Sequence, residues 1–401
     1  MSSDSHNNNR LIHKDVVLST ILTFAIFLLL KLVFVNTKYL DPLYQALSDF
    51  QFTDLYYSQY QQKQTSLDTN IVLVNIGNLK RDGLAQQLEI IKANHPKAIG
   101  LDATFIEKKD SVLDAYLKQE LNDTSVPIIL TSNIVYNDEE QDKAGSIEHN
   151  HEYFGMQNHE GFGNFLAKEG QSVRYFKPFI KIGDELDASF GARLAQIADS
   201  NAFNYLLNRN QSSEIINYQT TAYPKLDVYD IYSSAELSFL KDKIVLMGYM
   251  GGNLNEITFE DNHLTPFNKS YGGHSIPDMY GVEIHANIIS MILRRDYIYE
   301  VPGWITYLLA FVICAIHMYL FIYLFVKKHK WFHLGAKIVQ LISFAIVLLL
   351  SLVAFRYLRI KAEPSYILIG VILSCDALYF YEGIVEFLKE KIHFKTYFEH
   401  H

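Results

Sequence analysis

The chain has 401 residues, with 35 Lys and Arg against 44 Asp and Glu, and its net charge at pH 7 is −9. Residues 1–36 carry a net charge of +1 and residues 304–401 carry +4, which leaves −14 for residues 37–303. A surface this acidic repels nucleic acid and anionic lipid, so we exclude a nucleic-acid-binding function for the central part of the chain.

Four apolar stretches approach or exceed the ~20 residues that a helix needs to cross a bilayer. We predict transmembrane helices at residues 16–36, 304–326, 338–356 and 365–383. The first has a longer apolar core than a secretory signal peptide and no small-residue cleavage pattern after it, which indicates an uncleaved anchor. Both cysteines, Cys314 and Cys375, lie in predicted spans. A large exported domain without cysteines fits a bacterial envelope.

Lysines without a balancing acid mark the loop between the second and third predicted spans: Lys327, Lys328, Lys330 and Lys337. The positive-inside rule places this loop in the cytoplasm, at a bacterial inner membrane. Alternation then predicts cytoplasmic tails at residues 1–15 and 384–401 and a periplasmic domain at residues 37–303. Three basic residues in the predicted outer loop count mildly against this topology: Arg356, Arg359 and Lys361.

Residues 37–303 alternate between apolar stretches of strand length and helical patterns. A predicted helix begins at Asp41-Pro42 and reaches about residue 60. The predicted strands are residues 71–76, 98–103, 127–131, 173–176 and 243–248, and helices are predicted at residues 84–91, 111–121 and 189–207. Apolar strands separated by helices predict an α/β domain with a mainly parallel sheet covered on both faces. Residues 136–170 lose this pattern, and we predict a long surface excursion there.

The last predicted helix of the domain covers residues 281–293. Gly281 allows the backbone to turn sharply from the preceding loop into the helix. The apolar residues after it form two rows at helical spacing, which indicates a helix packed on two sides. Trp304 opens the next predicted span about ten residues later. This helix therefore leads from the domain into the membrane.

The sequence contains no recognisable catalytic or metal motif. The glycines of residues 248–252 follow a strand but fit neither phosphate-loop pattern. Two groups of histidines and acids lack metal-site spacing: His149, His151 and His159, and Asp261, His263, His274 and His285. No serine lies in a nucleophile elbow. We therefore predict a protein that is not an enzyme and that uses no cofactor or metal.

Three polar residues of the domain stand out by their position. Asp102 closes a predicted strand, so it either faces the sheet end where α/β domains bind ligands or caps a neighbouring loop, and we weigh the two about equally. Glu283 lies in the first turn of the last helix, where a carboxylate suits the positive end of the dipole. His285, two residues on, points elsewhere, and we expect it in a packed, hydrogen-bonded position.

Two ionisable residues lie inside predicted spans. His317 comes about thirteen residues into the second span and Asp376 about eleven into the fourth. At 1.5 Å per residue their depths agree within roughly 3 Å, which allows a contact. The alternative is a protonated Asp376 bonded to a helix carbonyl. We predict that Asp376 faces the helix bundle or a partner subunit rather than lipid.

A series of segments, in order along the chain, resembles the type-two CHASE domains, which are extracytoplasmic sensory domains of bacterial adenylate cyclases, histidine kinases and similar receptors. The most specific segment is Gly281-Val282-Glu283-Ile284-His285-Ala286-Asn287. The others are residues 49–56, 70–75, 97–105, 163–165, 170–174, 189–195 and 240–248, and Asp261 with Thr265-Pro266. The layout of one anchor, a sensory domain and three spans is similar as well.

The resemblance implies that residues 37–303 form a CHASE-type sensory domain. Asp102, Arg174 and Asp261 lie in matched segments and are charged types rarely buried without partners, so we expect them to converge near the carboxyl ends of the strands. With Glu283 and His285 they make up the predicted ligand-binding residues, for a ligand that the sequence does not identify.

The chain departs from the family pattern at three places. Asn75-Ile76-Gly77 stands where an Asp-Ile-Asp-like strand end is usual. The acidic pair of a D-x-D-G-x-x-R motif is replaced around Lys168-Glu169-Gly170. About 20 residues follow the last predicted span, where family members usually carry a cyclase or kinase.

We therefore predict a non-enzymatic sensor of the bacterial inner membrane. Its periplasmic domain would bind a ligand or partner, and the four helices would relay that state to a separate protein in the membrane or periplasm; a homo-oligomer is a further candidate assembly. The alternative is an accessory subunit of an envelope complex that uses the sensory fold as a docking platform. A third interpretation, an ion-conducting protein, rests on Asp376 and His317 alone.

Overall fold

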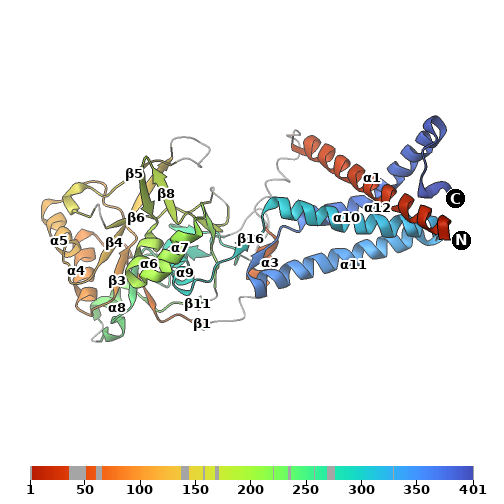
Figure 1. The fold of residues 1–401 in the computed structure, drawn as a ribbon. Helices are drawn as coiled ribbons and strands as arrows, with labels where there is room; N and C mark the ends of the chain where they lie inside the picture. The colour runs from red at the N-terminus through yellow and green to blue at the C-terminus, as the bar shows by residue number, and fades with distance from the viewer. Residues whose placement is uncertain are drawn as a thin grey trace. The chain divides into compact units, whose positions relative to one another are not determined.

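The computed structural model describes residues 2–35, 51–59, 66–136, 144–156, 159–167, 171–219, 221–233, 236–256, 258–268, 276–327 and 329–400 (Figure 1). The chain divides into two units, residues 49–298 and residues 1–48 with 299–401. The first unit is an α/β domain and the second holds the long helices. The predicted helix start at Asp41-Pro42 lies outside the described residues, which resume at residue 51 and contain α3 (Phe52–Gln59).

A seven-stranded sheet forms the centre of the α/β domain. Its strands are, in spatial order, β12 (Lys225–Leu226), β2 (Ile71–Asn75), β13 (Ile244–Gly248), β3 (Ala98–Leu101), β4 (Ile128–Tyr136) and β5 (Ala144–Glu148), and β6 (Glu160–Phe162) also pairs with β4. Every pairing is parallel except that of β4 with β5. The predicted mainly parallel sheet is confirmed, with an antiparallel strand that makes it mixed.

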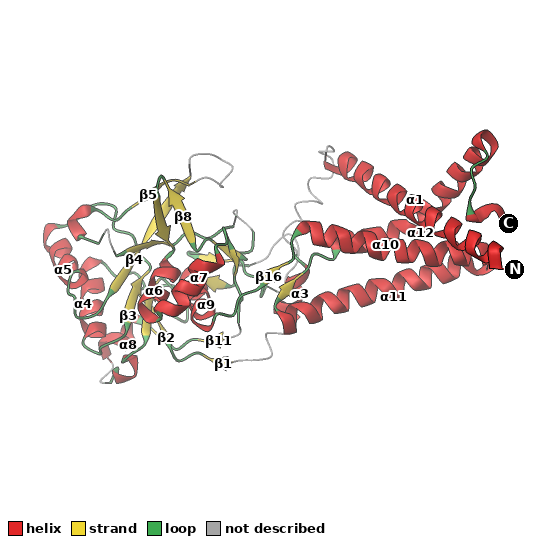
Figure 2. Ribbon diagram, in the orientation of Figure 1, coloured by secondary structure: helices red, strands yellow, loops and turns green. Residues whose placement is uncertain are grey.

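Helices cover both faces of this sheet (Figure 2). One face packs against α4 (Arg81–Lys92), α5 (Ser111–Leu121) and α8 (Val228–Ser233). The other face carries α6 (Phe190–Ala198) and α9 (Gly281–Arg294), on which α7 (Ser200–Arg209) packs. Side chains alternate between the faces, as the pleat requires. Val245 therefore belongs to the first core and its neighbour Leu246 to the second.

Short paired segments complete the described chain. These are β1 (Ser66–Leu67) with β11 (Thr221–Ala222), β7 (Tyr175–Phe176) with β10 (Glu214–Ile215), β8 (Phe179–Ile182) with β9 (Glu185–Ala188), β14 (Asn262–His263) with β15 (Met279–Tyr280), and β16 (Tyr299–Glu300) with β17 (Ile360–Lys361). Single turns of 3-10 helix lie at Glu152–Phe154, Ser238–Leu240, His329–Trp331 and Tyr397–His400.

The prediction that residues 136–170 form a surface excursion is wrong for the segments that join the sheet. Its described part contains β5 and β6, and all three residues of β6 are buried. Gly161 explains why β6 escapes an apolar pattern: a Cβ at this position would lie 2.7 Å from the backbone of Phe190 at the start of α6. The strand is therefore defined by close backbone packing rather than by large apolar side chains.

Two further predictions need correction. The strand predicted at residues 173–176 is the short β7, which pairs antiparallel with β10 outside the main sheet. The helix predicted at residues 189–207 is broken at Asp199, which adopts an extended conformation and accepts hydrogen bonds from the backbone N–H groups of Asn201 and Ala202. An N-cap of this kind starts a new helix, because it satisfies donors that the first turn leaves free.

The core position of Leu101 and Val245 carries a stability prediction. Both side chains are fully buried on the face that packs against α4 and α5. Truncation of either to alanine should cost roughly 2–4 kcal/mol, because transfer free energy and contacts around the cavity are lost together. Native-state hydrogen exchange of the β3 and β13 amides measures this loss. A near-zero change at both positions would contradict the packing of this core.

Within the described residues, four helices are long and apolar enough to cross a membrane, and all lie in the second unit. They are α1 (Ser2–Val35), α10 (Gly303–Lys327), α11 (Phe332–Val353), which continues as a π-helical turn at Ala354–Leu358, and α12 (Ser365–Ile392). Helix α1 already begins at Ser2, so the described part of the predicted tail, residues 2–15, is helical and continuous with the anchor. Helix α12 likewise extends nine residues past the predicted span end at 383.

The segment after α12 folds back onto the helices rather than forming a free tail. The carboxylate of Asp15 in α1 is fully buried and accepts hydrogen bonds from Tyr381 Oη at 2.7 Å, Thr396 Oγ1 at 2.8 Å and the backbone N–H of Tyr397 at 2.7 Å. Lys14 Nζ donates to the carbonyl oxygen of Lys395. These contacts join α1, α12 and the C-terminal segment.

The contact that the depths of His317 and Asp376 would allow is not formed. His317 lies between two helices instead, with Nδ1 2.8 Å from the carbonyl oxygen of Ile313 and Nε2 2.8 Å from Ser343 Oγ on α11. Asp376 is exposed on the surface of α12. The prediction that it faces the interior of this helix bundle is therefore wrong, while a contact with a partner subunit stays a prediction.

Candidate functional site

A cavity of about 510 Å³ lies in the α/β domain, where the carboxyl ends of the parallel strands meet the start of α9. Its lining residues are Asp102, Ala103, Thr104, Thr131, Asn133, Gly163, Asn164, Phe165, Tyr249, Glu260, Asp261, His263, Gly281 and His285. This edge of an open α/β sheet is where ligands usually bind. The volume is in the range of small-molecule sites.

Each wall of the cavity comes from an identifiable element. Asp102 directly follows β3 and Tyr249 directly follows β13, while Thr131 belongs to β4. The loop from Gly163 follows β6. The loop around β14 adds Glu260, Asp261 and His263, and α9 adds Gly281 and His285 from its first two turns. The cavity is therefore assembled from parts of the chain that are far apart in sequence.

Asp102 is anchored by its backbone and leaves its carboxylate to the cavity. Its N–H donates to the carbonyl oxygen of Met247 at 2.8 Å, which holds it between β3 and β13. Its side chain is 20% exposed and lies 4.0 Å from His285 Nε2. Burial, and next the charge of Asp261, raise the pKa of Asp102 to about 7. The charge of His263 and a hydrogen bond from Thr131 lower this pKa, but by less.

Asp261 lies against the amino end of α9. Its backbone has φ of 52°, in the left-handed region, and its carbonyl oxygen accepts a hydrogen bond from the Gly281 N–H at 3.1 Å. A Cβ on Gly281 would lie 3.1 Å from both carboxylate oxygens of Asp261. Glycine at the first position of α9 therefore admits this carboxylate, and the positive end of the helix dipole favours its charge there.

His285 is buried at the back of the cavity between two aromatic rings. Its ring centroid is 4.7 Å from that of Phe165 and 5.0 Å from that of Phe190, and the residue is only 4% exposed. Among the described residues, its Nδ1 has no hydrogen-bond partner. Burial, and then the charge of His263, lower the pKa of His285 to about 3. The imidazole is therefore neutral near pH 7, and the expected hydrogen-bonded position is not found.

Arg174 and Glu283 do not line the cavity, although both were expected among the ligand-binding residues. Arg174 makes a two-pronged ion pair with Asp54 of α3, with Nε–Oδ1 at 3.1 Å and Nη2–Oδ2 at 2.5 Å. Glu283 accepts from the Tyr280 N–H at 3.3 Å and pairs with Lys225 Nζ at 2.6 Å. The expected convergence therefore holds for Asp102 and Asp261 at the cavity and fails for Arg174.

Several lining residues were missed by the sequence reasoning. Thr131 was assigned only to a strand, and Phe165 only to a matched family segment. Tyr249 and Glu260 were not predicted as site residues, since a single aromatic or acidic residue in a loop forms no sequence pattern. The one available signal was the position of Tyr249 directly after a buried strand, the same signal that singled out Asp102.

The lining of this cavity suits a ligand that donates hydrogen bonds and carries positive charge. Three carboxylates, the neutral His285, His263 and the Thr131 hydroxyl line it, and none of its described lining residues is Lys or Arg. The described part of the chain contains no group of three or more His, Cys, Asp or Glu side chains that could hold a metal ion.

Residues 22–320, well over half of the chain, match the family model of the CHASE2 domain. The match begins within α1, includes the whole α/β domain and ends within α10. No curated protein and no solved structure matches the chain significantly.

Proposed function

Because the chain belongs to the CHASE2 family of bacterial extracytoplasmic sensory domains, we propose that it is a non-enzymatic sensor of the bacterial inner membrane. In this proposal the α/β domain lies in the periplasm and binds a ligand in the cavity. The membrane helices relay the bound state to a separate protein. The lysines of residues 327–337, around the junction of α10 and α11, support the orientation, since the positive-inside rule places them in the cytoplasm.

The position of α9 carries the proposal. Its first two turns line the cavity through Gly281 and His285, and its last residue is Arg294. Only residues 295–302 separate it along the chain from α10, which begins at Gly303. A ligand that shifts α9 therefore acts on the last helix of the α/β domain before a membrane helix. Relay requires such an element with different contacts in the two states.

An exposed acid in the membrane unit supports a protein partner. Asp376 lies on the outer surface of α12 among apolar side chains such as Phe380. An ionisable group inside a bilayer costs at least ~2.5 kcal/mol unless it is paired or hydrated. A polar group of a partner helix would lower this cost. The same observation fits an accessory subunit with a permanent partner, the second candidate function.

The test fills the cavity and follows α9. Asn133→Trp places a large side chain in the lining, and Asn204→Trp makes the same change at an exposed position of α7. Amide hydrogen exchange of the full-length protein in lipid nanodiscs should change by at least ~3-fold in residues 281–302 for the first variant only.

Two outcomes separate the candidates. If Asn133→Trp also changes which membrane proteins co-purify with the chain from native membranes, the sensor proposal stands. Exchange that changes around β4 but not along α9, together with unchanged co-purification, contradicts relay and favours the accessory subunit.

A further inference from the structure

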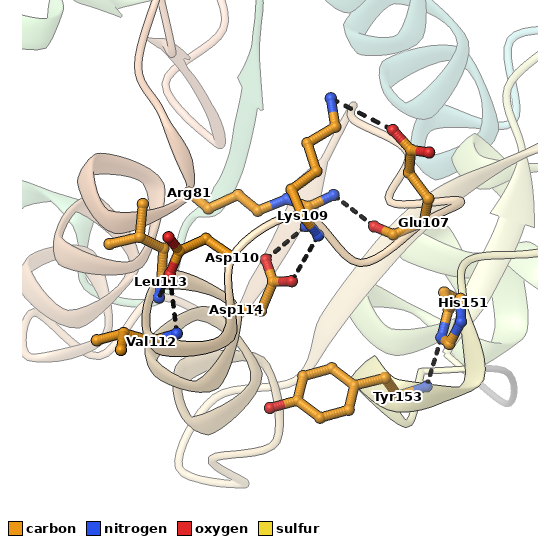
Figure 3. A network of polar contacts seen from close by, with 9 residues as sticks. All are labelled: Arg81, Glu107, Lys109, Asp110, Val112, Leu113, Asp114, His151 and Tyr153. Atoms are coloured by element: carbon orange, nitrogen blue, oxygen red, sulfur yellow. Dashed lines mark hydrogen bonds and ion pairs between the residues drawn. The ribbon is translucent and has the colours of Figure 1, made fainter.

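Buried acids of the α/β domain are, as a rule, paired with a cation. Asp114 is fully buried and accepts hydrogen bonds from Arg81 and from the backbone N–H of Lys109 (Figure 3). Burial alone would raise the pKa of Asp114, but these bonds lower it below its ordinary value. Other buried carboxylates have the same kind of partner: Asp54 with Arg174, Asp68 with Arg294, Glu120 with Lys92, and Glu214 with Arg209.

Asp102, whose side chain is 20% exposed, lacks such a cation, and so does the more exposed Asp261 (40%) beside it. Asp102 and Asp261 are paired with no lysine or arginine in the described chain, and their nearest ionisable neighbours of opposite type are histidines. The charge of Asp261 disfavours the ionised form of Asp102 and so contributes to the raised pKa of Asp102. Two facing carboxylates without a cation are costly unless a proton or a bound positive charge separates them.

A second, independent feature of the cavity is His285, neither of whose ring nitrogens has a hydrogen-bond partner among the described residues: Nδ1 is buried without one, and Nε2 lies 4.0 Å from Asp102 Oδ2. The residue is more than nine-tenths buried, lines the cavity and has a neutral ring. A buried polar atom without a hydrogen bond destabilises the folded state. Nε2 lies on the cavity side of the ring, beside Asp102, and a bound ammonium group would give it an N–H donor.

We propose that the cavity binds a small organic cation: an aliphatic amine with one or more ammonium groups and no carboxylate. Asp102 and Asp261 hold the ammonium group, and the neutral His285 accepts a further N–H. This inference rests on the proposed function of the cavity as the ligand site of the sensor, and it names the class of that ligand.

The size and walls of the cavity favour an organic body over a bare metal ion. A volume of about 510 Å³ is far larger than an ion with its ligands needs, and Phe165 and Tyr249 provide aromatic surface beside the acids. Aromatic faces attract organic ammonium groups and pack against their methylenes. A carboxylate on the ligand would meet Glu260, Asp261 and Asp102 without any lysine or arginine among the described lining residues, so an amino acid fits less well.

The test is calorimetric titration of the full-length protein in detergent at pH 8, where Asp102 is ionised. The probes are 1,4-diaminobutane and spermidine, with 1,4-butanediol as the uncharged counterpart of the diamine and Mg²⁺ as the metal alternative. At least one amine should bind at one site per chain, and neither butanediol nor Mg²⁺ should compete with it.

Variants assign the binding to the cavity. Asp102→Asn and Asp261→Asn should each weaken amine binding at least ~10-fold, or about 1.4 kcal/mol. Asp184→Asn, the same charge change at an exposed residue of the β8–β9 turn, controls for the general attraction of cations to an acidic domain and should leave binding unchanged.

Equal loss in all three variants, equal affinity for butanediol, or displacement of the amine by Mg²⁺ would overturn the proposal. Amides of β3 and β13 that stay protected from exchange show that each variant is folded. The relay experiment uses no ligand, so absence of amine binding leaves the sensor proposal intact, and absence of relay leaves amine binding intact.

Discussion

Replacing Arg174 with methionine is expected to lower the free energy of unfolding of the α/β domain by about 3–5 kcal/mol. Arg174 is 8% exposed and Asp54 is 3% exposed, and two hydrogen-bonded contacts join them. Loss of the guanidinium leaves the carboxylate of Asp54 buried without its cation, which is the costly part of breaking such a pair. Hydrogen exchange of the β2 and β13 amides in the full-length protein measures the change.

Two comparisons separate this structural role from ligand binding. Asp54→Leu combined with Arg174→Met should recover much of the loss, because no uncompensated charge remains. Lys225→Met breaks the more exposed pair with Glu283 and should cost less than about 1 kcal/mol. An Arg174→Met variant with normal stability and weakened amine binding would instead return Arg174 to the ligand site.

Asp102 and His285 are expected to give the domain two opposing pH dependences that nearly cancel. The native state keeps the Asp102 proton up to a pKa of about 7, while an unfolded aspartate loses it near 3.8. Between these values the native state binds more protons, so this group makes stability fall as pH rises, by up to about 4 kcal/mol in total. His285, with a pKa of about 3 against 6.5 unfolded, makes stability rise with pH over its own interval.

Single replacements of Asp102 and His285 should reveal each of these two pH dependences separately. Relative to the original chain, Asp102→Asn should gain stability as pH rises from 4 to 7, by about 1.4 kcal/mol per pH unit. His285→Gln should lose relative stability from pH 3 to 6.5 at a similar rate. The groups that face Asp102 are Asp261, His263, His285 and the Thr131 hydroxyl, and all remain in the first variant. Parallel stability curves for Asp102→Asn and the original chain would refute the raised pKa.

The strands at the centre of the sheet could be predicted because burial on both faces demands an apolar sequence. Ile71–Asn75 and Ile244–Gly248 are buried at every residue, so their sequences contain almost nothing else. Strand β6 could not be found this way, because Glu160 is held by hydrogen bonds to Asn150 and Gly161 by the close approach of α6. The break at Asp199 was missed, although aspartate is a preferred N-cap residue.

The candidate site could be predicted only where local sequence already indicated geometry. Asp102 follows a strand and His285 lies in the first turns of a helix, so their neighbourhood followed from the fold. Arg174 was misplaced because a buried arginine that pairs with an acid looks, in sequence, like one that binds a ligand. Its partner Asp54 is 120 residues away, and only the folded chain brings the two together.

Few residues of α9 can be replaced without disturbing the structure. Eleven of its fourteen residues are buried. The other positions include Glu283, which holds Lys225, and Arg294, which holds Asp68. Most exchanges along it therefore disturb a core, the cavity or an ion pair, whereas loops such as the β8–β9 turn tolerate replacement. A sequence profile that searches for distant relatives should accordingly give high weight to Gly281–Arg294. The residues of this helix are constrained by packing as well as by common descent.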